Sequence, residues 1–213
     1  MCFSTEASFG ASAILATIGI TTLSKVKSKK NYLFASIPLI FGAQQFSEGL
    51  IWLSFSNPNY FGYRQISTYY FLTFAQVLWP LIVPLCLLII ENRRAEKIIL
   101  ILLTIMGLTV ATYHFFCLIL YPVSVEIIKH HIYYKLDFSA KFRCFEKILY
   151  LTPILFSFFV PSERKMKLIG ILIFFSFLTS IIFFKDNIIS VWCFFAALVS
   201  IVVYSIINNQ YIK

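Results

Sequence analysis

Long apolar segments bounded by charged or polar residues recur along the whole chain. A helix needs roughly 20 predominantly apolar residues to cross the hydrocarbon core of a bilayer. Seven segments fit this pattern: 8–23, 32–55, 66–90, 98–121, 144–160, 168–184 and 188–207. We therefore predict an all-α membrane protein in which residues 1–213 form a single seven-helix transmembrane bundle, with no stretch left for a separate soluble domain.

The connection between the fourth and fifth spans has a different period. Every second residue from Ile132 to Phe138 is apolar, and Tyr, Lys and Asp stand between them. Such alternation is typical of a β-strand, and the preceding residues 124–129 are its nearest partner. We predict a short extracytoplasmic β-hairpin within 123–143 that covers the outer mouth of the bundle. A surface loop with chance alternation is the alternative.

The composition agrees with a lipid surrounding. Of the 213 residues, 60% are hydrophobic and 13% are charged, whereas soluble domains carry roughly 25% charged residues. The mean hydropathy is +0.85. A soluble globule of this size could not hide so much apolar surface. The composition therefore excludes a soluble nucleotide-binding enzyme and a disulfide-framed secreted domain.

The formal net charge of +9 indicates an orientation rather than a nucleic-acid partner, because basic loops are retained on the cytoplasmic side. The spans place the larger group of basic residues on one side: Lys25, Lys27, Lys29, Lys30, Arg93, Arg94, Lys97, Arg164, Lys165, Lys167 and Lys213. The smaller group lies on the other side: Arg64, Lys129, Lys135, Lys141, Arg143, Lys147 and Lys185. We predict an outside N-terminus and an inside C-terminus in the plasma membrane, the bacterial inner membrane, with membrane lipids as partners.

Polar side chains within the spans mark a candidate site. Glu48 in the second span and His114 in the fourth lie at a similar depth below the outer boundary, given a rise of about 1.5 Å per residue. Gln44, Gln45 and Trp52 share a helix face with Glu48. Ionisable residues in lipid are costly and face the bundle interior, so each is a functional hypothesis.

The third span adds Gln76 and Trp79 beside Pro80 and Pro84. Each proline lacks an amide hydrogen and frees the carbonyl four residues earlier, so we expect a kinked helix whose Gln76 carbonyl lines a cavity. Together these side chains predict one outward-facing ligand pocket, lined by Glu48, Gln44, Gln45, Trp52, Gln76, Trp79, His114 and Trp192. The alternative is that the polar groups only bond helices to one another.

Cysteines supply a further hypothesis. Four of them lie near the predicted outer boundary: Cys2, Cys117, Cys144 and Cys193. They could pack as small hydrophobic residues, which we favour, form one disulfide, or bind zinc or copper through His114, Cys117, Cys193 and Cys2. No spacing typical of a metal site is present, so we assign no cofactor. We expect His130 and His131, in the hairpin, to be exposed.

Small residues predict close helix packing. Ser8, Ser12 and Ala16 stand four residues apart in the first span, and Ala196 and Ser200 do so in the seventh. Such spacing lets helix backbones approach each other closely in membranes. We therefore expect the first span to be buried against a neighbour.

Three groups of residues carry a resemblance to a known family: the opening Met1-Cys2-Phe3-Ser4 with Ala7-Ser8-Phe9, the stripe from Gln44 to Trp52, and the segment from Ser190 to Tyr204. The chain resembles an uncharacterised bacterial family of small multi-pass membrane proteins that begin MCFS-x-x-ASF, classed as a domain of unknown function. The resemblance covers nearly the whole chain and implies no activity. It implies that the N-terminal peptide and the 44–52 stripe are features of the family.

Three functions remain open. The first, which we favour, is a protein that binds or transports a small ligand through the outward-facing pocket. The second is a structural or assembly subunit that forms a homo-oligomer or joins another membrane partner. The third is a membrane-embedded lipid hydrolase, with or without a metal ion, in which Glu48 or His114 acts as general base or metal ligand. No nucleophile motif accompanies these two residues, so the pattern favours a protein that is not an enzyme.

Overall fold

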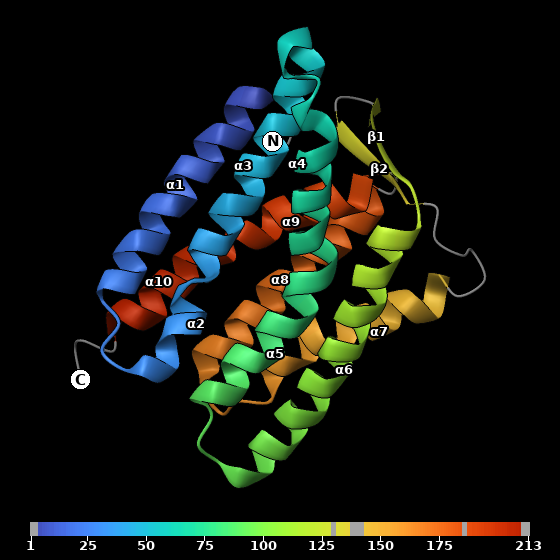
Figure 1. Ribbon diagram of the computed structural model, residues 1–213. Helices are drawn as coiled ribbons and strands as arrows, with labels where there is room; N and C mark the ends of the chain where they lie inside the picture. Colours follow the sequence, from blue (N-terminus) through green and yellow to red (C-terminus); the bar gives the residue numbers. More distant parts are fainter. Residues whose placement is uncertain (1–3, 129–130, 137–142, 185–186, 210–213) are drawn as a thin grey trace.

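The computed structural model describes residues 4–128, 131–136, 143–184 and 187–209, which form a helical bundle with a two-stranded sheet near one end (Figure 1). The α-helices are α1 (Thr5–Ser24), α2 (Tyr32–Ala35), α3 (Ile37–Ser56), α4 (Tyr63–Leu72), α5 (Trp79–Ile90), α6 (Arg94–Leu120), α7 (Arg143–Phe156), α8 (Arg164–Phe183), α9 (Ile188–Ala197) and α10 (Val199–Asn209). Shorter turns are η1 (Lys29–Asn31), η2 (Pro58–Tyr60), the π-helical η3 (Thr73–Leu78) and η5 (Ser157–Phe159).

Five helical segments are long and apolar enough to cross a membrane. Within the described residues they are Thr5–Ser24, Tyr63–Ile90, Arg94–Leu120, Arg164–Phe183 and Ile188–Asn209. The predicted second and fifth spans are not among them. The interior of α3 carries two glutamines and a glutamate, which lower its hydropathy, and α7 has only 14 residues. The chain is therefore a helical membrane protein, and seven spans stay a prediction.

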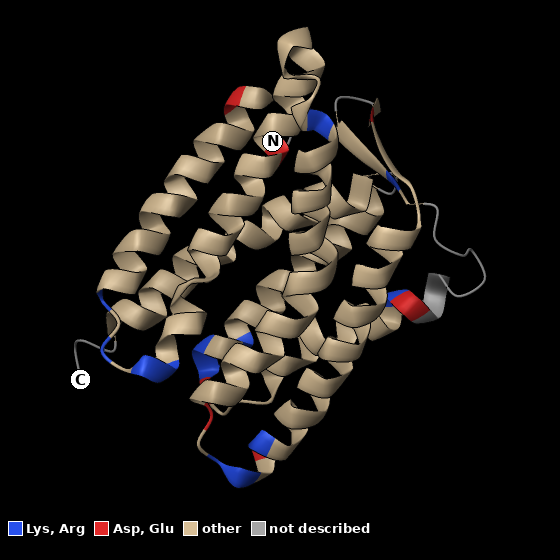
Figure 2. Cartoon of the chain, in the orientation of Figure 1, with Lys and Arg blue, Asp and Glu red and all other residues tan. Residues whose placement is uncertain are grey.

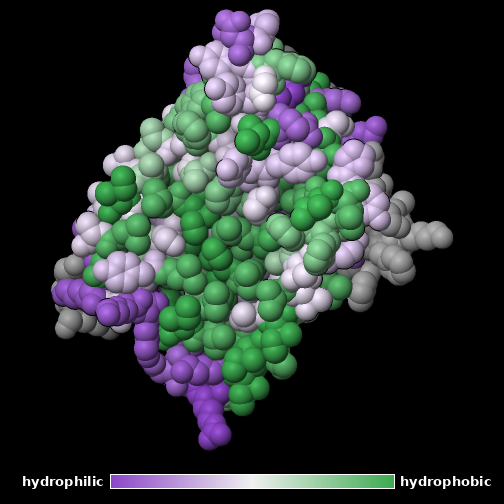
Figure 3. Space-filling model, viewed as in Figure 1, coloured by the Kyte–Doolittle hydropathy of each residue, from purple (hydrophilic) through white to green (hydrophobic). Residues whose placement is uncertain are grey.

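The surface agrees with this assignment. The face drawn in Figure 3 carries a broad band of hydrophobic side chains between more hydrophilic ends. Large apolar residues such as Ile14, Leu120 and Phe183 are more than half exposed. Exposed side chains of this kind are stable against lipid and unfavourable against water.

The first helix packs closely against α3, as the small residues of α1 predict. Ser8 and Ser12 are buried, and Ser12 Oγ donates a hydrogen bond to the carbonyl of Gly42 at 2.8 Å. A Cβ placed on Gly19 would lie 2.7 Å from the backbone nitrogen of Leu39. Only glycine fits at that crossing because any larger residue would push the two backbones apart.

The prolines of the third predicted span alter its helix. The segment Tyr63–Ile90 runs from α4 through the π-helical turn η3 into α5, and Pro80 follows directly after that turn. A π-helical turn accommodates the missing amide hydrogen of a proline. The regular α-helix is thus interrupted just before Pro80, and the expected kink stays a prediction. The opposite helix approaches there, since a Cβ on Gly107 of α6 would lie 2.0 Å from the Pro80 carbonyl oxygen.

The connection after α6 is a β-hairpin, as the alternating pattern predicts. Strands β1 (Val123–Ile128) and β2 (His131–Leu136) pair antiparallel, with Val123 opposite Leu136. Their buried face joins a hydrophobic cluster with α3 and α4, and the ring of Phe71 stacks on Tyr134 at 4.8 Å between centroids. The hairpin is therefore anchored to the bundle. His130, Asp137 and Phe138 lie outside the described residues.

One expectation about the hairpin is wrong. His131 is buried, with 8% of its surface exposed, rather than exposed. It is the first residue of β2, and the ring of Phe184 contacts it edge-on at 5.0 Å between centroids. Asn187 reaches the same end of the hairpin and donates a hydrogen bond to the carbonyl of Ile128 at 3.4 Å. The polar face of the alternating pattern thus meets the end of α8 at this point.

Candidate functional site

His114 on α6 connects two neighbouring segments of the bundle. Its Nδ1 lies 3.1 Å from the carbonyl oxygen of Gln76, and its Nε2 lies 2.9 Å from Oε1 of Glu146 on α7. Pro80 explains the first contact because it has no amide hydrogen to give to the carbonyl four residues earlier. The imidazole is 1% exposed, so these contacts satisfy both ring nitrogens away from water.

The two contacts define how many protons the His114–Glu146 pair holds. A carbonyl oxygen only accepts hydrogen bonds, so Nδ1 of His114 carries a hydrogen and donates it to Gln76. The contact between Nε2 and Glu146 then holds one further proton. That proton sits either on the imidazole, beside an ionised carboxylate, or on the carboxyl, beside a neutral imidazole. In both forms the pair carries no net charge.

Glu146 is a residue of this site that the sequence analysis missed, and Lys147 and Tyr150 are others. Glu146 stands near the beginning of α7 and resembles a boundary residue of the fifth span. Helical spacing was the available signal, since Glu146 and Tyr150 are one turn apart on one face. The Tyr150 hydroxyl donates a hydrogen bond to the carbonyl of Ala75. This face of α7 therefore contacts the π-helical turn directly through Tyr150 and indirectly through His114.

A cavity of about 310 Å³ lies between this pair and the hairpin. We call it the polar cavity because His114, Glu146 and Lys147 line one part of it, and Tyr133 and Leu136 of β2 cover it. Other lining residues are apolar: Leu151, Phe177, Ile181, Ile188 and Ile189. Small-molecule sites in proteins have volumes from about 300 Å³ and combine apolar walls with a few polar groups.

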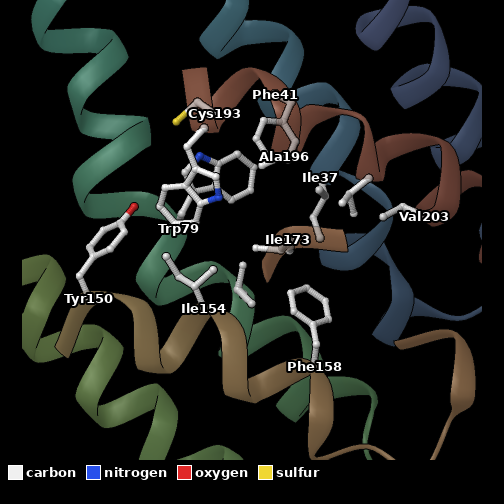
Figure 4. Close-up of a pocket in the computed structure, with 13 residues that line it drawn as sticks. Ile37, Phe41, Trp79, Tyr150, Ile154, Phe158, Ile173, Cys193, Ala196 and Val203 are labelled. Atoms are coloured by element: carbon white, nitrogen blue, oxygen red, sulfur yellow. The ribbon is translucent and has the colours of Figure 1, made fainter. Parts of the chain in front are cut away.

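Figure 4 shows the residues that line a second, smaller and apolar cavity of about 40 Å³. Its wall includes Phe41 and Trp79, whose rings stack at 4.1 Å between centroids. Tyr150, Trp192 and Cys193 line both cavities. The two spaces are therefore neighbours, and the smaller one extends the apolar side of the larger.

The polar stripe of α3 forms contacts between helices. Nε1 of Trp79 donates a hydrogen bond to Oε1 of Gln44 at 2.8 Å, and the Ser190 hydroxyl of α9 donates one to Glu48. Gln44 and Glu48 are fully buried, and neither lines the polar or the apolar cavity. The geometry of these two residues fits the alternative in which polar groups bond helices to one another.

The remaining predicted site residues divide between the cavities and the core. Gln45 and Trp52 are buried outside both cavities, and within the described chain neither the Gln45 amide nor the Trp52 indole nitrogen has a hydrogen-bond partner. The predicted residues that line the polar cavity are Gln76, His114 and Trp192. The structure thus brings only part of the predicted set together, and ligand binding by these residues stays a prediction.

The described residues contain no cluster of side chains that could bind a metal ion. No three His, Cys, Asp or Glu side chains in that part of the chain lie close enough to hold an ion. Cys117 and Cys193 are buried free thiols, and the ring nitrogens of His114 contact Gln76 and Glu146. Cys2 and the side chain of Cys144 lie outside the described part of the structure.

Fold and site together define a helical membrane protein with a polar cavity beneath a β-hairpin. The chain belongs to DUF6629, a family of unknown function, whose family model matches residues 1–212. This match confirms the resemblance to a family of unknown function. No curated protein and no solved structure matches the chain significantly.

Proposed function

We propose that the protein crosses the plasma membrane seven times, with its N-terminus outside and its C-terminus inside. The distribution of charge supports this topology. The basic segments 25–30, 93–97 and 164–167 gather at one end of the bundle (Figure 2), and basic residues are retained on the cytoplasmic side. The hairpin lies toward the other end (Figure 1), so in this topology the polar cavity faces outward beneath it.

We further propose that the protein binds, and in the course of its function transports, a small ligand in the polar cavity. The observation that carries this proposal is the His114–Glu146 pair on the wall of a cavity of about 310 Å³. Ionisable groups at membrane depth are costly to maintain and occur mainly at functional sites. A purely structural pair would be equally stable without a cavity beside it, and interiors are normally close-packed.

Native mass spectrometry of the protein released from mild detergent tests this function. Ile181 of α8 lines the polar cavity, whereas its neighbour Ile182 is 56% exposed. Ile181→Trp fills the cavity, and Ile182→Trp adds the same side chain to the outer surface as a matched control. We expect the wild type and Ile182→Trp to retain a small molecule that Ile181→Trp loses.

The outcome also separates the other candidate functions. Identical bare masses for all three proteins would contradict ligand binding. A bare oligomer would instead favour the structural or assembly subunit, with other copies or membrane proteins as partners. Lipid acyl chains are the partners that we propose for the exposed apolar surface in every case.

A further inference from the structure

We propose that the ligand of the polar cavity is an anionic amphiphile with a single apolar chain. This inference rests on the proposed ligand binding and names the chemistry of the ligand. Two features of the cavity carry it: the net charge of its polar wall, and the continuity of its apolar wall with the neighbouring apolar cavity.

Among the described residues that line it, the polar wall carries one net positive charge. The His114–Glu146 pair is neutral as a whole, because a single proton is held between two groups that would otherwise be a neutral imidazole and a carboxylate. Lys147, the next residue on α7, also lines the cavity and is exposed. Of the described lining residues, Lys147 is therefore the one that contributes net charge. A lysine ammonium at the edge of a cavity attracts a carboxylate or phosphate and disfavours a cationic group.

The apolar wall indicates a chain attached to that head group. Phe177 and Ile181 of α8 and Ile188 of α9 face the same space as Lys147. Beyond Tyr150 and Trp192 lies the apolar cavity, which extends this surface. Burial of methylene groups away from water is favourable, so a hydrocarbon chain gains from this wall and a free anion does not.

The inference is tested by measuring how tightly small probes bind to the protein in phosphatidylcholine nanodiscs. The salt concentration is about 150 mM, so that distant charges are screened. The probes are decanoate, decan-1-ol and decyltrimethylammonium, which share one chain, together with acetate and inorganic phosphate, which lack it. Native mass spectrometry counts bound probe, and site binding is the part that Ile181→Trp abolishes. We expect decanoate to bind at least about tenfold more tightly than decyltrimethylammonium, and acetate and phosphate to bind far more weakly.

Variants of Lys147 test whether this residue supplies the positive charge that attracts the head group. Lys147→Gln should weaken decanoate binding by about tenfold and leave decan-1-ol unchanged, and Lys147→Arg should retain decanoate. Lys135→Gln is the matched control, since Lys135 is exposed on β2 and does not line the cavity. If decyltrimethylammonium binds as tightly as decanoate or more tightly, the proposal of an anionic head group is wrong, while ligand binding itself still holds. If acetate or phosphate binds as tightly as decanoate, the proposal of an apolar chain is wrong. If no probe distinguishes wild type from Ile181→Trp, the proposed function itself fails.

Discussion

At the scale of single residues, Pro80 and His114 act as a pair although they lie on different helices. The proline leaves the Gln76 carbonyl without its helical hydrogen bond, and the imidazole of His114 supplies a replacement at 3.1 Å. A buried carbonyl without a partner is costly, so each residue is tolerated partly because the other is present. The same imidazole contacts Glu146, which links this backbone defect to the polar cavity.

His114→Ala should therefore lower the free energy of unfolding by on the order of 1 kcal/mol in detergent micelles, because the Gln76 carbonyl loses its partner. In a Pro80→Ala background the helix regains an amide hydrogen for that carbonyl. The same His114→Ala change should then cost clearly less. Denaturant titrations of the four proteins of this double-mutant cycle measure the difference. Strict additivity of the two substitutions would show that the residues are not coupled.

At the scale of helices and strands, periodicity in the sequence predicted much of the architecture. The hairpin followed from alternation between Ile132 and Phe138, because strands expose and bury alternate residues. The disturbance before Pro80 followed from the chemistry of proline. Glu146 could not be placed in the same way. Its spacing from Tyr150 marks a helix face, but its contact with His114 depends on where α7 crosses α6, which the local sequence does not determine. The burial of His131 depends likewise on Phe184, which is distant in sequence.

The seam between α1 and α3 gives a test at this scale. Gly19 has the backbone of Leu39 within 2.8 Å of a placed Cβ, whereas Gly10 in the same helix has nothing within 4 Å. Gly19→Ala should destabilise the protein by about 1–3 kcal/mol, as overpacking does in cores. Gly10→Ala should be neutral or slightly stabilising, because alanine favours helix by up to about 1 kcal/mol over glycine.

Thermal unfolding of both glycine variants in the same detergent provides the comparison. If the Gly19→Ala variant unfolds at the same temperature as the wild type, this result would contradict the close approach of α1 and α3. Because both changes add one methyl group to the same helix, a general effect of alanine on helicity cannot account for a difference between them.

At the scale of the whole molecule, the number of membrane crossings depends on α3 and α7. Both were predicted as spans, and neither meets the length and hydropathy of the five apolar segments. Some of their polar groups have partners inside the bundle, since Gln44 contacts Trp79 and Glu146 contacts His114. A helix whose polar side chains are satisfied by neighbours can cross a bilayer without a fully apolar sequence. We therefore keep α3 and α7 as predicted spans, although their hydropathy or length alone does not identify them.

Cysteine labelling in intact cells tests both whether α7 crosses the membrane and which way the protein is oriented. The background is Cys2→Ser, Cys144→Ser, in which the remaining cysteines, Cys86, Cys117 and Cys193, are buried. Asn59→Cys precedes α4 and Glu163→Cys follows α7, and both positions are exposed. Three crossings separate them if α7 spans the membrane. A membrane-impermeant maleimide should then label Asn59→Cys directly and Glu163→Cys only after permeabilisation. Labelling of both in intact cells would remove α7 from the spans, and the reverse pattern would invert the orientation and place the polar cavity on the cytoplasmic side.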